Sequence, residues 1–480
     1  MKLFKYLFLI LGVFLLAGIT AYFAWFHNAY EHTLHLDPVS VYAEQGEGHL
    51  ITNANIVDVE SGKLIEAKHL LIRNGIIDRI FTGSIPDSLI ELYHVTDVAG
   101  KYIMPALIDM HAHLNSGGLI PPDASTRTMA LEQFARYGIG VVFTWGGHGF
   151  NQKITADLIV KQQNRAIVAP KIFATGDVLT APGGYPISLL PMIMAISEDE
   201  LDLDELGISI VSEETDLDAL FLIKKELGLK GIKVMVESGL GGGPEEPRLS
   251  NEMLKKIVKK ASEYNFPVFA HISVKADFED AINAGVDVIG HTVGDQLLTN
   301  ADKLFEKMIN DFIYYTPTLS IAYLYQYTAS AEILDDPFML QYSSERTNRS
   351  LKNWPIRQMM VRSAGFDKDE LQKNMLQNFT LFHEAGVSIL MGADAGNPSV
   401  IPGYSSHKEM EFMAQQGMPI ADVLRSATIV PARFLKFEDE MGSIAEGKVA
   451  SFLVLGRNPL EDVRNSQSIN RVMLEGYWIE

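Results

Sequence analysis

The residues best suited to chemistry are two histidines, His111 and His113, near the end of the apolar stretch Pro105–Leu114. Alternate residues of a β-strand face the same side, so a His-x-His pair directs two imidazoles toward one point. Neutral imidazole is a common zinc ligand, and two converging rings supply half of a four-ligand site. The pair therefore predicts a metal site, provided that the chain supplies further ligands.

Further candidate ligands stand at the ends of apolar segments later in the chain. His271 ends the run Pro267–His271, His291 follows Val288–Gly290, and Asp394 follows Leu390–Ala393. Catalytic residues of parallel α/β barrels gather at the carboxyl ends of the strands. We therefore expect these side chains to meet His111 and His113.

Lys233 lies inside the otherwise apolar run Gly231–Val236. An unpaired ammonium is costly in an apolar interior, and burial lowers the pKa of lysine toward the free amine. A free amine can add carbon dioxide, and the resulting carbamate can bridge two metals. The alternative is a structural lysine that reaches solvent or forms a salt bridge.

The elements needed to position these residues follow from the alternation of short apolar runs with helical segments. Helices are expected at 251–264, 274–284 and 368–385, and long loops at 177–218 and 323–366. Eight strands separated by helices predict an α/β fold, most simply a closed (β/α)8 TIM-type barrel over 102–439. The predicted strands are Ile103–Asp109, Val141–Thr144, Ile167–Ala174, Gly231–Val236, Val268–His271, Val286–His291, Phe312–Thr316 and Val387–Ala393.

The flanks of this region, 49–101 and 440–480, contain short alternating strands. Asn74-Gly75 between two such strands is a strong signal for a β-hairpin. The two flanks together predict a small β-sandwich domain formed from both ends of the chain.

The N-terminal segment places Lys2 and Lys5 before an apolar run, Tyr6–Phe26, of membrane-spanning length. Positive residues stay in the cytoplasm, so a signal anchor over 1–26 and a linker over 27–48 would hold the catalytic domain outside it, in the periplasm of a Gram-negative cell. Secretion after signal cleavage is the alternative.

Composition limits the remaining partners. The 480-residue chain is 47% hydrophobic and carries a formal net charge of −20, so nucleic acid is not an expected partner. It contains no cysteine, which leaves nitrogen and oxygen ligands for any metal. A small-molecule substrate is expected, and a homo-oligomer is left open.

Several motifs resemble the amidohydrolase superfamily, and more narrowly its imidazolonepropionase-like and prolidase-like metal-dependent hydrolases. The resemblance covers Leu50–Glu480; Ala106 and Ser451 depart from the usual glycine and aspartate, away from the predicted ligands. It implies that His111, His113 and Asp394 bind one divalent metal, that His271 and His291 bind a second, and that carbamylated Lys233 bridges them. The motifs are Met104–Leu114, Gly231–Met235, Val268–His271, Ile289–Thr292, Gly392–Gly396 and Asn458–Asp462.

Such a site predicts a binuclear hydrolase of amide bonds in dipeptide-like or N-acyl amino acid substrates, with zinc as the expected metal. A metal-bridging hydroxide would be the nucleophile, and Asp394 would carry its proton to the leaving group. The alternatives are a mononuclear cyclic-amide hydrolase or deaminase, an esterase or lactonase, and a membrane-tethered scaffold without activity.

Two further residues are candidate substrate contacts. His148 follows the second predicted strand, and Tyr185 follows the third within Ala181–Pro186. Either side chain could hydrogen-bond a substrate, although a histidine in a turn needs no such role.

Overall fold

A computed structural model describes residues 48–118, 124–147, 149, 151–191, 197–239, 242–243, 245–363 and 367–479. The predicted signal anchor, His148, and all but the last residue of the predicted linker lie outside these ranges. Among the described helices, none is both long and apolar enough to cross a bilayer.

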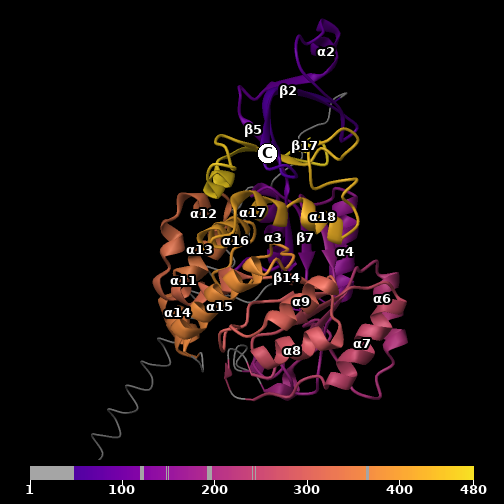
Figure 1. Cartoon of the computed structure of the whole chain (residues 1–480), viewed down its shortest axis with the longest axis vertical. Helices are drawn as coiled ribbons and strands as arrows, with labels where there is room; N and C mark the ends of the chain where they lie inside the picture. Colours follow the sequence, from indigo (N-terminus) through magenta and orange to yellow (C-terminus); the bar gives the residue numbers. More distant parts are fainter. Residues whose placement is uncertain are drawn as a thin grey trace, which may run out of the picture.

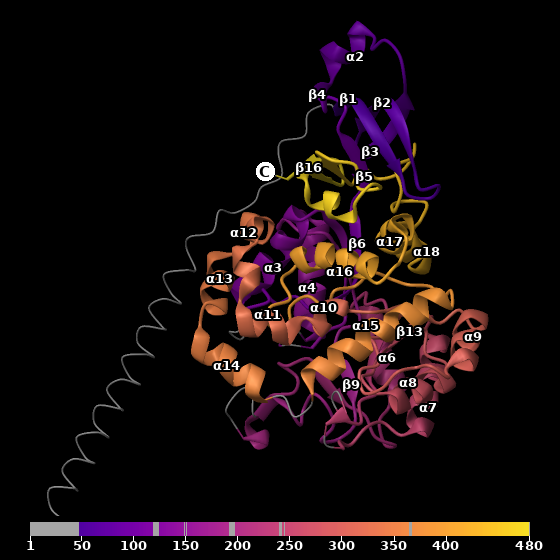
Figure 2. The same ribbon diagram turned by 60° about the vertical axis from the view of Figure 1, so that its left-hand side comes forward.

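Strands from both flanks of the chain form one eight-stranded sheet, with the order β17-β16-β15-β5-β1-β2-β3 and with β4 paired to β1. Figures 1 and 2 show the indigo and yellow segments side by side at one end of the molecule. The hydrogen bonds thus join strands from both flanks into a single sheet. The strands are β1 His49–Asp58, β2 Lys63–Arg73, β3 Ile76–Phe81, β4 His94–Asp97, β5 Tyr102–Pro105, β15 Phe452–Leu455, β16 Ile469–Leu474 and β17 Tyr477–Trp478, with helix α2 at Asp87–Leu92.

The predicted hairpin at Asn74-Gly75 is confirmed, because β2 and β3 pair antiparallel on either side of it. Both turn residues have positive φ, 51° and 77°, as a two-residue type I′ turn requires. Ile72, Ile103 and Phe452, from three different strands, pack in one core and so hold the flanks together.

The rest of the described chain is a parallel α/β structure. One sheet has the order β6-β7-β8 and the other β10-β9-β11-β12-β13-β14, and all of their strand pairs are parallel. The strands are β6 Leu107–Ala112, β7 Ile139–Thr144, β8 Lys171–Ala174, β9 Val178–Thr180, β10 Ile208–Ile210, β11 Ile232–Met235, β12 Val268–His271, β13 Val288–Gly290 and β14 Tyr314–Thr316.

Backbone hydrogen bonds connect the two parallel sheets at both ends. The amide of Lys230, before β11, donates to Ala174 of β8. On the other side, Leu390 donates to Tyr315 of β14, and Met110 of β6 donates to Met391. The segment around 390 thus lies between β14 and β6.

Helices cover these sheets, and those predicted from sequence agree closely with the structure (Figure 1). Ser250 caps α7 by accepting a hydrogen bond from Met253 N, and Gly285 ends α8 in the left-handed conformation. The helices are α3 Ala124–Arg136, α4 Gln152–Gln163, α6 Leu217–Glu226, α7 Asn251–Glu263, α8 Lys275–Ala284, α9 Asp302–Asn310, α15 Lys368–Glu384, α16 Tyr404–Gln415, α17 Ile420–Ser426 and α18 Ile429–Phe434.

Four details differ from the sequence prediction. The first predicted strand is divided, since β5 pairs with the flanking sheet and only β6 joins β7. The segment 387–393 makes an isolated bridge through Ile389 but no regular strand. The predicted loop 177–218 contains β9 and β10. The predicted loop 323–366 is largely helical (Figure 2): α10 Leu319–Ala322 is followed by α11 Leu324–Ser330, α12 Pro337–Tyr342, α13 Glu345–Leu351 and α14 Trp354–Ser363.

Candidate metal centre

Asp394 lies among three of the predicted histidine ligands. Its Oδ1 is 3.0 Å from His113 Nε2 and 3.4 Å from His111 Nε2. Its Oδ2 is 3.8 Å from His291 Nδ1. The chain therefore brings together side chains that are separated by up to 283 positions, and His111, His291 and Asp394 present ligand atoms within 4.8 Å of one another.

His271 adds a fourth imidazole beside this group. Its ring centroid is 4.4 Å from that of His291, which in turn is 4.7 Å from that of His111. All four histidines are buried and lie at or just beyond the carboxyl ends of β6, β12 and β13. The parallel register aligns these strand ends, because His271 pairs with Gly290, which immediately precedes His291.

The hydrogen bonds of three histidines determine which ring nitrogen remains for a metal. His113 Nδ1 donates to the carbonyl of Gly146 at 2.7 Å, so Nε2 is the nitrogen that faces Asp394 Oδ1, at 3.0 Å. His271 Nε2 lies 3.2 Å from the Glu237 carboxylate, which leaves Nδ1. His291 Nδ1 lies 2.9 Å from the Thr318 hydroxyl, which leaves Nε2. A histidine that binds a metal through one ring nitrogen commonly hydrogen-bonds a nearby protein group through the other.

His111 provides the test of whether this donor set fits a metal. It is completely buried, and neither of its ring nitrogens has a hydrogen-bond partner within the described part of the chain. Buried polar atoms are otherwise nearly always paired, and a metal ion accounts for an unpaired imidazole beside a carboxylate. The nitrogen and oxygen donors fit a divalent cation such as zinc.

Lys233 of β11 points into the same region. Its side chain is buried, and its Nζ lies 3.8 Å from the ring centroid of Trp145, which itself stacks on His111 at 3.5 Å. A lysine in this position cannot reach solvent, so the alternative of a solvent-reaching side chain is excluded. Burial holds the pKa of Lys233 well below its ordinary value, against the attraction of Asp394, and so favours the free amine.

The same burial favours the neutral form of three of the imidazoles. It holds the pKa of His111, His271 and His291 well below the ordinary value for histidine. Burial alone would raise the pKa of Asp394, but the surrounding imidazoles hold it well below its usual range. Neutral imidazole and ionised carboxylate are the protonation states that bind metals.

The backbone near the ligands allows close approach. Asp394 and His291 both have left-handed backbones, with φ of 57° and 73°. A side chain on Gly392 would place a Cβ only 2.7 Å from the backbone nitrogen of His111. Glycine at 392 therefore allows the segment that carries Asp394 to lie directly against β6.

Of the two predicted substrate contacts, Tyr185 lies at this centre. Its ring stacks on His271 with centroids 5.0 Å apart, and burial raises the pKa of its hydroxyl well above the ordinary value. The structure places Tyr185 after β9, a strand that the sequence prediction missed. His148 remains untested because it lies outside the described residues.

Two residues at the centre were not predicted. Glu237 is buried beside His271. Trp145 stacks on His111 of β6 and donates its indole N–H to Met110 O at 2.7 Å. The sequence could have indicated Glu237, because it lies four positions after Lys233 and alternate residues of an extended segment face the same side.

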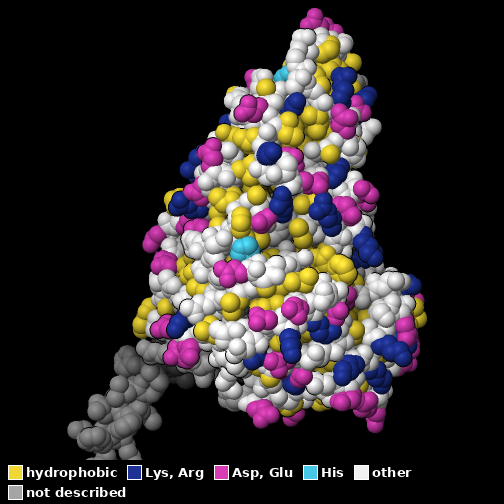
Figure 3. Space-filling view, in the orientation of Figure 1, with side chains coloured by type: hydrophobic (Ala, Val, Ile, Leu, Met, Phe, Trp, Pro, Cys, Tyr) yellow, Lys and Arg dark blue, Asp and Glu magenta, His cyan; other side chains and the backbone are white. Residues whose placement is uncertain are grey.

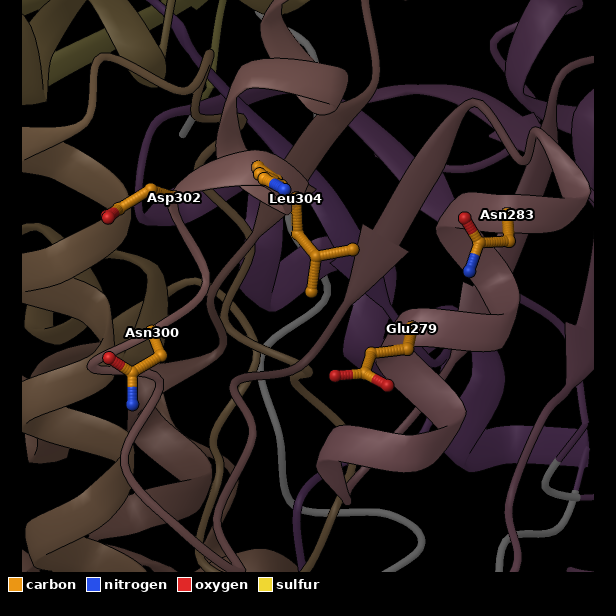
Figure 4. A pocket seen from close by; sticks show the side chains of 6 residues that line it. Glu279, Asn283, Asn300, Asp302 and Leu304 are labelled. Atoms are coloured by element: carbon orange, nitrogen blue, oxygen red, sulfur yellow. The ribbon is translucent and has the colours of Figure 1, made fainter.

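The outer surface shows no comparable constellation on the face seen in Figure 3, where Lys and Arg are interspersed with Asp and Glu among the described residues. A polar hollow between α8 and α9 is lined by Glu279, Asn283, Asn300, Asp302, Lys303 and Leu304 (Figure 4). It contains none of the residues of the histidine cluster and is separate from it.

Comparison with known sequences places the centre in a family. The Amidohydrolase family profile matches residues 102–479. Ochratoxinase of Aspergillus niger is 24% identical over 443 residues, which cover 86% of this chain and 83% of the ochratoxinase. A dihydroorotase of Carboxydothermus hydrogenoformans is 45% identical over 71 residues, 15% of each chain.

Solved structures show the same fold. A Xaa-Pro dipeptidase with bound methionine has a TM-score of 0.69 at 23% identity, covering 90% of this chain and 99% of that chain. A. niger ochratoxinase has a TM-score of 0.67 at 20% identity, covering 91% and 96%. A putative prolidase from Bifidobacterium longum has a TM-score of 0.67 at 23% identity, covering 91% and 95%.

Proposed function

Because the chain belongs to the amidohydrolase family and is a metal-dependent hydrolase of carbon–nitrogen bonds, we propose a specific reaction for it. It uses two divalent metals to cleave an amide bond in a dipeptide-like or N-acyl amino acid substrate. The proposed architecture is a closed (β/α)8 barrel. The hydrogen bonds that link β8 to β11 and β14 to β6 through the segment around 390 support this closure.

The convergence of Asp394 with four buried imidazoles is the observation that carries the proposal. His111, His113 and Asp394 would hold one metal, and His271 and His291 the other. Lys233, as a carbamate, would bridge the two. Divalent metals, zinc being the expected one, would polarise the scissile carbonyl and lower the pKa of water that attacks it.

The protein's own residues would then move the proton and orient the substrate. Asp394 is ionised at neutral pH and so can accept a proton from the attacking water. The same carboxyl group would donate that proton to the departing amide nitrogen, so that the products are a carboxylic acid and an amine. The hydroxyl of Tyr185, whose ring stacks on His271, would hydrogen-bond a substrate carbonyl or carboxylate.

The names of the similar proteins support a small amide-containing substrate, since they include a Xaa-Pro dipeptidase and a putative prolidase. A second candidate is a cyclic amide opened at a single metal. The local matches to three dihydroorotases are the reason for including cyclic amides among the candidate substrates.

Metal content and substrate range test both candidates together. The purified full-length chain would be analysed by inductively coupled plasma mass spectrometry and assayed with Xaa-Pro dipeptides, N-acyl amino acids, cyclic amides, esters and lactones. Two metals per chain with release of free amino acid is the expected result. One metal per chain with activity limited to cyclic amides would instead favour the second candidate.

A further inference from the structure

Glu409, on α16, is a completely buried carboxylate with no part in the proposed reaction. Its Oε1 accepts a hydrogen bond from Leu319 N at 2.6 Å. Its Oε2 accepts from Ser320 N at 2.7 Å and from Ser320 Oγ at 2.8 Å. Burial raises the pKa of Glu409 to about 8, although these three donors oppose the shift. The group is therefore largely protonated at neutral pH, and a buried carboxyl group with three hydrogen-bond donors calls for a reason.

All three donors belong to the start of α10, so Glu409 caps this short helix from another part of the chain. The residue at the N-cap position, Thr318, does not use its own side chain for capping. Threonine in this position usually accepts a hydrogen bond from the first turn of its helix. Because Glu409 already satisfies those amides, the hydroxyl of Thr318 is available for another partner.

That partner is the proposed metal ligand His291, whose Nδ1 lies 2.9 Å from Thr318 Oγ1. Thr318 reaches this position with φ of 50° and ψ of 48°. A left-handed backbone is unfavourable for a β-branched residue and persists only where the surroundings enforce it. The hydrogen bonds from Leu319 and Ser320 to Glu409 hold the backbone immediately after Thr318.

The helix that carries Glu409 also contacts the other side of the centre. One turn earlier, Ser406 Oγ donates to Asp109 Oδ2 at 2.6 Å, and Asp109 Oδ1 accepts from His111 N at 3.1 Å. Helix α16 is thus hydrogen-bonded to the strand of one ligand and to the loop that supports another.

We propose that Glu409 is a positioning residue for the metal held by His291. By capping α10 in place of Thr318, it frees the Thr318 hydroxyl to bind His291 Nδ1, which orients the ring and leaves Nε2 for the metal. This inference depends on the metal centre of the proposed function. Mutation of a residue that hydrogen-bonds a metal ligand typically lowers metal affinity by about 10- to 100-fold.

The test measures zinc affinity by competition with a chromophoric chelator in the full-length protein. Glu409→Gln replaces one acceptor with an amide nitrogen that cannot accept, and Thr318→Val removes the hydroxyl at nearly constant shape. Each is expected to weaken the binding of one zinc by about 10- to 100-fold. Thr318→Ser retains the hydroxyl and is expected to restore most of the affinity.

The double variant Glu409→Gln/Thr318→Val distinguishes action through Thr318 from a general loss of packing. If Glu409 acts through Thr318, the two losses are expected to be less than additive. His407→Gln is the matched control, because His407 is buried on the same helix but contacts Ser466 Oγ and Tyr137 O. It is expected to lower the melting temperature without changing zinc affinity.

The outcomes separate this inference from the proposed function. A wild-type chain that binds no zinc would overturn both. Normal zinc binding by the wild type together with unchanged affinity in Thr318→Val would overturn the positioning role alone. That variant decides the question even if Glu409→Gln does not fold.

Discussion

Replacing Asp394 with asparagine removes the proposed proton carrier while disturbing little else. Asparagine is close in volume to aspartate and, among non-glycine residues, tolerates the left-handed backbone that position 394 adopts, with φ of 57°. The backbone hydrogen bond from residue 394 to His111 O is unaffected. The remaining amide oxygen can still face His113 Nε2, which lies 3.0 Å from Oδ1 in the native protein.

The expected effect on catalysis follows from the lost proton transfer. A positioned general base contributes about 10²- to 10⁴-fold to a rate. This range corresponds to about 3–5 kcal/mol in the activation free energy. Asp394→Asn should therefore lower kcat by several orders of magnitude in protein that contains its full complement of metal, while its melting temperature stays close to that of the wild type.

The assay would pair kcat for the best substrate of the panel with metal content per chain. Asp367→Asn is a suitable control, because Asp367 caps α15 on the surface and asparagine caps a helix equally well. Turnover near the wild-type value in metal-replete Asp394→Asn would refute the assignment of Asp394 as the base. Loss of activity together with loss of metal would identify it as a ligand only.

Three other predictions follow. His407 is buried, and burial lowers its pKa to about 4, so the residue is neutral in the native state at neutral pH. The unfolded chain binds this proton at higher pH than the native state does, so the free energy of unfolding increases as pH rises from 4 to 6.5. The difference from the ordinary value amounts to about 3 kcal/mol, and urea unfolding across this range should show a flatter pH dependence in His407→Gln than in the wild type. Glu237→Gln should weaken the binding of the metal held by His271 by about 10- to 100-fold, because the Glu237 carboxylate fixes the His271 ring through Nε2 at 3.2 Å. Zinc competition measures this affinity, and an unchanged value would show that the contact is incidental. Deleting residues 1–26 should move the protein from the membrane fraction to the soluble fraction, and an unchanged distribution on fractionation would contradict the signal-anchor prediction.

The sequence alone determined the features that depend on local periodicity. Strand alternation identified His111 and His113 as a pair, and the apolar run around Lys233 predicted a buried side chain, which Lys233 has in the structure. The ends of apolar runs identified His271 as a candidate ligand in the same way. Helices with a local end signal, such as Ser250 before α7 and Gly285 after α8, were also predictable because such signals lie within a few residues of the helix.

Tertiary structure decided which side chains surround the proposed metal ligands. The contacts of Trp145 with His111, and of Glu409 with the loop that holds Thr318, join residues far apart in the chain, and no local pattern encodes them. The same holds for the segment that carries Asp394, which forms no regular strand. It lies close to β6 because Gly392 has no side chain to prevent the contact. Periodicity shows which face of an element is buried, but the partner that it meets there depends on packing across the whole fold.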